Sequence, residues 1–108
     1  MPPKRKGKSQ AGLRDELLAL LREIREPIIV RYAELAGNPG RVAVHDAVIR
    51  DLEDGREARV TNVQLATALQ RFGADRATVA AVAGAPAMFR VNADGEFIPD
   101  REVIDVRL

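Results

Sequence analysis

The sequence predicts an α+β fold that is mostly helical, with helices at the N-terminus and a β-hairpin near the C-terminus. Apolar residues recur every three or four positions from residue 11 to residue 83. Glycine, asparagine and proline interrupt this pattern at intervals typical of helix ends. Short alternating runs then flank a turn at residues 92–95. At 108 residues, the chain has room for one modest core.

Residues 1–10 are expected to form a disordered basic arm. They carry Lys4, Arg5, Lys6 and Lys8, two prolines and a glycine, and they lack an apolar face. Such a segment cannot bury enough apolar surface to offset the entropy of ordering. Residues 11–108 hold 13 arginines against 16 acidic residues. Any attraction to a polyanion is therefore expected to depend on the arm and on local arginine placement.

Residues 11–37 are expected to form a helical segment that serves assembly. Leu13, Leu17, Leu20 and Ile24 have the 4-3-4 spacing of a coiled-coil seam. This face either pairs across an oligomer interface or packs on the chain's own body, and the sequence leaves both open.

Pro27 predicts a kink or break after the first helix, because proline disfavours helical geometry in the residue before it. A second helical segment follows and ends at Gly37. Its apolar residues, which we expect to face inward, are Ile28, Tyr32 and Leu35.

Residues 38–108 are expected to form a second unit. A helix ending at Gly55 precedes a short strand at residues 58–60, and Thr61 with Gln64 then fits a capping box that opens another helix. Gly73 closes that helix and Asp75 caps the next. A hairpin over residues 88–98 and an alternating strand over residues 103–108 complete the chain.

The order helix, strand, helix, tight turn, helix, hairpin resembles a winged helix-turn-helix over residues 41–98. The sequence Gly73-Ala74-Asp75-Arg76-Ala77-Thr78-Val79-Ala80-Ala81-Val82 is similar to the G-V-S-x-x-T-V-x-x-V pattern of that DNA-binding superfamily. It departs from the pattern just before Gly73, where Gln70-Arg71-Phe72 lengthen the preceding helix. The resemblance implies binding of duplex DNA by the second helix of this motif, with Arg90 on the wing contacting phosphates or the minor groove. A solvated hairpin face is the alternative for Arg90.

The residues expected to contact nucleic acid are basic or hydroxylated. On the body they are Arg71, Arg76, Thr78 and Arg90, and on the arm Lys4, Arg5, Lys6 and Lys8. Base-edge recognition needs several Arg, Lys, Asn or Gln side chains. The presumed recognition helix offers one Arg and one Thr, so we expect phosphate contacts and little sequence specificity. A solubilising tail and a nuclear-import segment remain alternatives for the arm.

The sequence contains no recognisable set of catalytic residues. The only serine is Ser9 in the basic arm, and the chain has no cysteine. His45 is the only histidine, so we expect no multi-histidine metal site and place His45 half-exposed on a helix. No catalytic residue, cofactor, small-molecule substrate or membrane span is expected.

Two functions remain open. The first is a DNA-binding regulatory or architectural protein, expected to be a homodimer or higher oligomer. The second is a protein-interaction adaptor that uses the winged domain and an edge strand ending at Leu108. We expect a cytoplasmic protein, at the nucleoid if the source is bacterial and in the nucleus if it is eukaryotic or viral.

Overall fold

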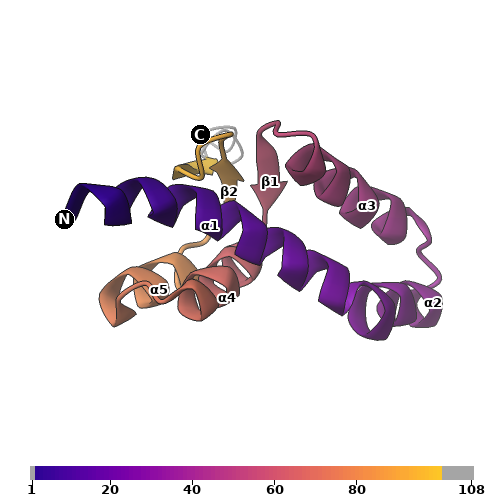
Figure 1. Cartoon of the computed structure of the whole chain (residues 1–108). Coiled ribbons are helices and arrows are strands. Elements are labelled where there is room, and N and C mark those ends of the chain that lie inside the picture. The colour runs from indigo at the N-terminus through magenta and orange to yellow at the C-terminus, as the bar shows by residue number, and fades with distance from the viewer. Residues whose placement is uncertain (1, 101–108) are drawn as a thin grey trace.

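A computed structural model of the chain describes residues 2–100, and the side chains of residues 12–100. The fold is α+β and mostly helical, with a three-stranded antiparallel sheet in the order β1-β2-β3 (Figure 1). In chain order the elements are α1 (Pro2–Ile24), the π-helix η1 (Arg25–Val30), α2 (Arg31–Ala36), α3 (Gly40–Glu53), β1 (Ala58–Val60), α4 (Asn62–Phe72), α5 (Arg76–Ala83), β2 (Met88–Val91) and β3 (Phe97–Asp100). The strand expected over residues 103–108 lies outside the described residues.

The basic N-terminal segment is helical in the structure, where the sequence predicts an irregular arm. Residues 2–10 form the first turns of α1. Once later turns of a helix are held by packing, extending the helix by one residue costs far less than starting it. Pro2 and Pro3 are compatible with this because the first turn of a helix does not need their missing N–H groups.

The apolar face of α1 lies in the core of this chain. Leu13, Leu17, Leu20 and Leu21 are buried together with residues of α4 and the sheet, and Ile24 packs against them. Of the two arrangements that the sequence leaves open for Leu13, Leu17, Leu20 and Ile24, the described chain has the one in which this face packs on its own body. It also joins the two predicted units, residues 11–37 and 38–108, in one shared core.

The chain remains helical through Pro27, where the sequence predicts a kink or break. Residues 25–30 form the π-helix η1, which runs directly into α2. Proline cannot donate to the carbonyl four residues earlier, and a local π-helix is one way for a helix to accommodate such an interruption. Each π-type hydrogen bond encloses one more residue than an α-type bond, so the faces that follow are rotated.

That rotation accounts for an error in the predicted inward face. Ile28, Tyr32 and Leu35 are exposed, whereas Ala33, one position after Tyr32, is buried. An added residue turns a helix by about 100°, since there are 3.6 residues per turn. The apolar stripe of α1 therefore does not continue along α2, and three large apolar side chains face solvent.

Local turn and cap signals are confirmed. Thr61 and Gln64 form the expected capping box, with Gln64 N–H donating to Thr61 Oγ1 (3.0 Å) and Thr61 N–H donating to Gln64 Oε1 (3.1 Å). Gly73 ends α4 at φ +98°, and Asp75 occupies the N-cap position of α5 but makes no side-chain capping hydrogen bond to the helix backbone. Both hairpin strands and the short strand β1 form where the sequence predicts them.

The sheet has a buried face and an outer face. Val60, Phe89 and Val91 point into the core, which α1 and α4 complete on the other side. The register pairs Arg59 with Arg90 and Arg90 with Ile98, so these three residues share the outer face. The sheet therefore separates a packed interior from a surface that carries two arginines.

Candidate nucleic-acid interface and apolar groove

The α4–α5 turn has the geometry that the sequence predicts. Gly73 adopts a left-handed conformation, and the N–H groups of Gly73 and Ala74 both donate to Leu69 O, at 3.0 and 2.9 Å. The two helices are thereby separate and packed against each other. The Thr78 hydroxyl donates to Asp75 Oδ1 at 2.6 Å, and this bond holds the pKa of Asp75 below its usual value. The Thr78 hydroxyl proton is thus already engaged within the first turn of α5.

Arg76 is the first residue of α5 and its side chain is exposed. Among the described residues it makes no ion pair. The exposed residues after it on α5 are alanines, so the helix offers one cation and a small, smooth surface. Such a surface can approach a phosphate backbone closely, but it has few groups that could read base edges.

Arg71 points to α1 and is engaged there. Its Nη1 and Nη2 donate to Glu23 Oε1 and Oε2 at 2.9 and 3.0 Å. These bonds and the charge of Arg71 lower the pKa of the Glu23 carboxyl. The guanidinium is therefore neutralised by a carboxylate of the same chain. The structure does not bring Arg71 together with Arg76 as a free cation.

Arg90 lies at mid-strand on the outer face of the sheet, away from the hairpin turn. Its Nε is buried without a hydrogen-bond partner among the described residues. The turn itself is closed by Asn92, whose Oδ1 accepts from the N–H groups of Asp94 and Glu96. Asp94 and Glu96 are exposed, so the tip of the predicted wing is acidic. This differs from the phosphate-contacting wing that the resemblance implies.

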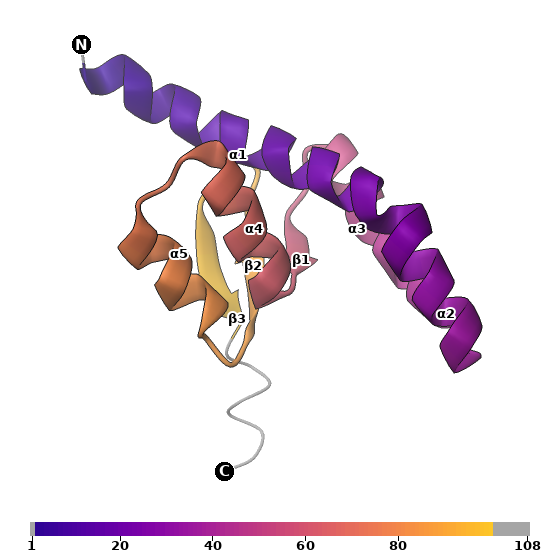
Figure 2. The same cartoon turned by 90° about the horizontal axis from the view of Figure 1, so that it is seen from below.

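The basic segment leaves the body between the α4–α5 turn and the turn of the β-hairpin. A Cβ placed on Gly12 would lie 2.5 Å from Phe72 at the end of α4, and Arg14 contacts the backbone of Asn92 at the hairpin turn. The helical turns that precede Gly12 project past α4 and α5 (Figure 2). Lys4, Arg5, Lys6 and Lys8 belong to these turns, and their side chains lie outside the described ones.

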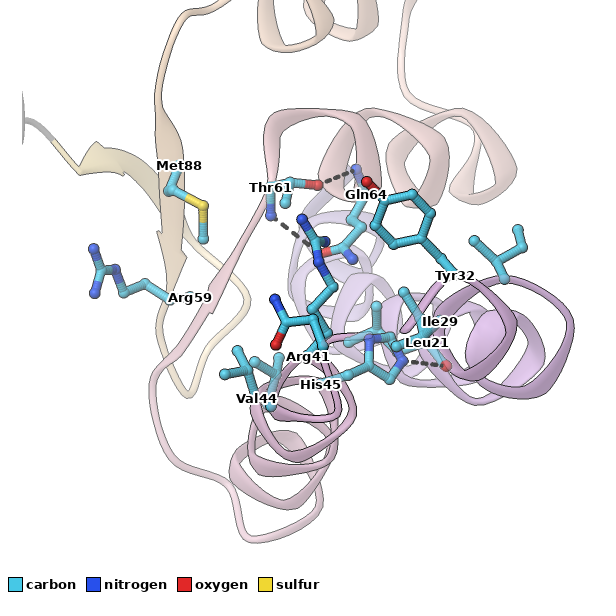
Figure 3. Close-up of a pocket in the computed structure, with 14 residues that line it drawn as sticks. Leu21, Ile29, Tyr32, Arg41, Val44, His45, Arg59, Thr61, Gln64 and Met88 are labelled. Atoms are coloured by element: carbon cyan, nitrogen blue, oxygen red, sulfur yellow. Dashed lines mark hydrogen bonds between the residues drawn. The ribbon is translucent and has the colours of Figure 1, made fainter. Parts of the chain in front are cut away.

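A second feature, which the sequence did not predict, is a groove of about 680 Å³ between the η1–α2 segment, α3 and the edge of the sheet. Figure 3 shows Tyr32 and Ile29 on one side of it and Met88 and Arg59 on the other. The remaining lining residues are Leu21, Ile28, Asn38, Gly40, Arg41, Val44, His45, Val48, Thr61 and Gln64. No carboxylate is among the residues that line it.

His45 lies in the wall of this groove and is buried, not half-exposed as expected. Its side chain is only 6% exposed, and Nε2 donates to Leu21 O at 2.7 Å (Figure 3). A carbonyl oxygen can only accept, so the hydrogen bond assigns the Nε2–H form. His45 therefore joins α3 to α1. Local sequence patterns cannot reveal this contact, because the two partners are 24 residues apart.

Two arginines lie beside the groove, and they have different kinds of partner. Arg41 stacks over the Tyr32 ring, with 4.7 Å between the guanidinium carbon and the ring centroid. Arg59 Nε lies 2.7 Å from Asp100 Oδ2 across the outer face of the sheet. Arg41 is therefore positioned by an aromatic ring, and it makes no ion pair among the described residues.

Some site types are absent from the described part of the chain. Within residues 2–100, no group of three or more His, Cys, Asp or Glu side chains could hold a metal ion. No helix in the same range has both the length and the apolar character needed to cross a bilayer. The chain matches no family model, no curated protein and no solved structure.

Proposed function

We propose that the protein binds nucleic acid, with duplex DNA as the preferred form, through the basic turns of α1 and the N-terminal end of α5. The observation that carries the proposal is the position of the basic segment. It emerges from the body between Phe72, at the α4–α5 turn, and Asn92, at the hairpin turn. In this proposal the four cations of the basic turns, together with the exposed Arg76, supply the positive charge that phosphates bind.

The same surface argues for contacts to the backbone with little reading of sequence. Arg71 is neutralised by Glu23, the Thr78 hydroxyl is bonded to Asp75, and the hairpin tip is acidic. From the predicted body set, Arg76 is an exposed cation without an ion pair among the described residues, whereas Arg90 lies at mid-strand with its Nε buried. Phosphate contacts fix position and supply most of the salt-dependent affinity, while base contacts specify sequence. An architectural role is therefore favoured over recognition of one operator.

The test is a titration of a fluorescently labelled duplex of random sequence, followed by anisotropy at several salt concentrations. Four phosphate contacts predict a slope of log K against log salt of about −3 to −4. Replacing Lys4, Arg5, Lys6 and Lys8 together by Ala is expected to remove most of that slope. Arg50→Ala is the control, because Arg50 is exposed on α3 and makes no ion pair with any residue that the structure describes. Salt-independent binding, or none, would refute the proposal.

A protein-interaction adaptor is the second candidate, and the groove beside α3 favours it. Ion pairs within the chain engage five of the eleven arginines of residues 12–100, which weakens any broad attraction to a polyanion. The version that relies on an edge strand at residues 103–108 lies outside the described residues. Retention of DNA affinity after substitutions in the groove would separate the two functions.

A further inference from the structure

Most of the exposed large apolar side chains of the described chain gather on one helical hairpin. Four of six lie on η1, α2 and α3, and the other two are Val63 and Ile98. The four are Ile28, Tyr32, Leu35 and Val44. They are here called the hairpin patch, after the helical hairpin of η1, α2 and α3 and not after the β-hairpin. Leu35 is 77% exposed and Val44 is 67% exposed. Single exposed apolar residues are ordinary, but a contiguous group beside a groove is typical of a protein–protein interface.

The hairpin patch combines a projection with a hollow. Ile28, Tyr32 and Val44 line the groove, whereas Leu35 is on the same helical segment as Tyr32 but outside the groove lining. A surface that carries both a knob and a matching hollow can pair with a copy of itself about a two-fold axis. A partner of unrelated sequence would need only the hollow.

The charges around the hairpin patch have both signs. Arg31 and Glu34 are exposed on α2, and neither makes an ion pair among the described residues. Arg41 is exposed at the start of α3, where it stacks on Tyr32. Elsewhere on the body, arginines such as Arg22 and Arg25 pair with carboxylates of the same chain. Charges of both signs that make no ion pair among the described residues allow the patch to pair with a copy of itself, and a partner of a single sign would place like charges opposite part of it.

We propose that the hairpin patch is the interface of a homodimer, in which each copy inserts Leu35 into the groove of the other. In this arrangement Glu34 of one copy faces Arg41 of the other, and two-fold symmetry gives the contact twice. The burial of Leu35, Tyr32 and Val44 supplies the affinity, while the Glu34–Arg41 contacts fix the register. This proposal rests on the hairpin patch alone and is independent of nucleic-acid binding.

The first test measures mass against protein concentration by sedimentation equilibrium. The wild-type chain is expected to show a monomer–dimer equilibrium. Leu35→Asp and Val44→Asp should each weaken dimerisation by at least about tenfold, because they bury an unpaired carboxylate. Val63→Asp is the matched control, since Val63 on α4 is 61% exposed and lies outside the groove lining. Circular dichroism checks that each variant keeps its helices.

A charge exchange tests the register without relying on apolar substitutions. Arg41→Glu and Glu34→Arg should each be monomeric, because each places like charges opposite one another at both contacts. An equimolar mixture of the two variants should form a heterodimer, in which both contacts are restored. Such recovery can arise only between chains, so a contact within one chain could not produce it.

Four outcomes overturn the proposal. If the wild-type chain stays monomeric at every concentration, the hairpin patch is not a homodimer interface. If Val63→Asp weakens dimerisation as much as Leu35→Asp does, the dimer interface is not the hairpin patch. A dimer that tolerates both Asp substitutions, or single charge variants that do not recover on mixing, rejects the arrangement of Leu35 and of Glu34 opposite Arg41.

Discussion

The guanidinium of Arg14 donates a hydrogen bond of 2.6 Å to the carbonyl oxygen of Asn92, 78 positions further along the chain. Its other amino group donates to Arg56 O at 2.9 Å and to Leu52 O at 3.2 Å. Arg14 is 7% exposed. One buried side chain thus joins α1, the carboxyl end of α3 and the turn of the hairpin, with carbonyl oxygens as its acceptors.

Arg14→Met is expected to lower the free energy of unfolding by about 2–4 kcal/mol, because it leaves buried carbonyl oxygens without donors. Arg14→Lys should recover only part of this, since an ammonium group cannot reach the spread of acceptors that the guanidinium fork reaches. Urea denaturation measures both values. Arg22→Met is the control, because Arg22 makes an exposed ion pair with Glu53 and its loss should cost less than about 1 kcal/mol. If Arg14→Met and Arg22→Met lowered the free energy of unfolding equally, the hydrogen bonds of Arg14 would not stabilise the fold as argued.

Arg14 also marks the limit of what the sequence could predict. Caps and turns depend on residues a few positions apart, so Thr61 with Gln64, and Gly73, could be assigned from spacing alone. Arg14 has the charge and helical position of a solvated residue. Nothing local distinguishes it from Arg22, and only the packing of distant segments buries it.

The candidate site was predictable to the same extent. Arg76 is exposed as expected, because its position follows from the cap at Asp75. The pairing of Arg71 with Glu23 joins residues 48 positions apart, and spacing along α4 cannot reveal it. The sequence pattern places Ile28, Tyr32 and Leu35 in the interior, because the added residue of the π-helix, which rotates Tyr32 outward, has no signature beyond Pro27.

Gly73→Ala is expected to destabilise the fold by about 1–2 kcal/mol, because a side chain at φ +98° meets its own backbone. No other atom lies within 4 Å of a Cβ at this position, so the cost is conformational. Gly40→Ala is the control. Gly40 has an ordinary helical backbone, and its added methyl group meets only Asn38 Oδ1, at 3.4 Å. Thermal unfolding measures both variants, and an equal effect at the two sites would show that the turn does not require glycine.

The ion pair of Asp46 with Arg25 predicts how the stability of the fold changes with pH. Arg25 Nε and Nη2 donate to its two carboxylate oxygens at 2.7 and 2.9 Å, and these bonds hold the pKa of Asp46 below its usual value. The unfolded chain therefore binds the proton more readily than the folded one. The stability that this pair contributes is complete above the unfolded pKa of about 4 and is lost as pH falls through the folded pKa.

Asp46→Asn should consequently be less stable than the wild type at neutral pH, and the difference should narrow as the solution is acidified below about pH 4. Other carboxylates titrate in both proteins, so they cancel in the comparison. Urea midpoints at neutral and acidic pH provide the measurement. A difference that stays constant across this range would show that the carboxylate charge of Asp46 does not stabilise the fold.

Arg76 and Arg71 should differ in their effect on nucleic-acid binding, although they lie five positions apart. Arg76→Ala removes an exposed, unpaired cation at the start of α5, and it is expected to weaken duplex binding for all sequences and to reduce the salt slope by about 1. Arg71→Ala removes a guanidinium already neutralised by Glu23, so it should leave the slope unchanged. The same anisotropy titration measures both. If Arg71→Ala reduces the slope and Arg76→Ala does not, the interface lies on the α1–α4 side of the molecule, and the arrangement around α5 is wrong.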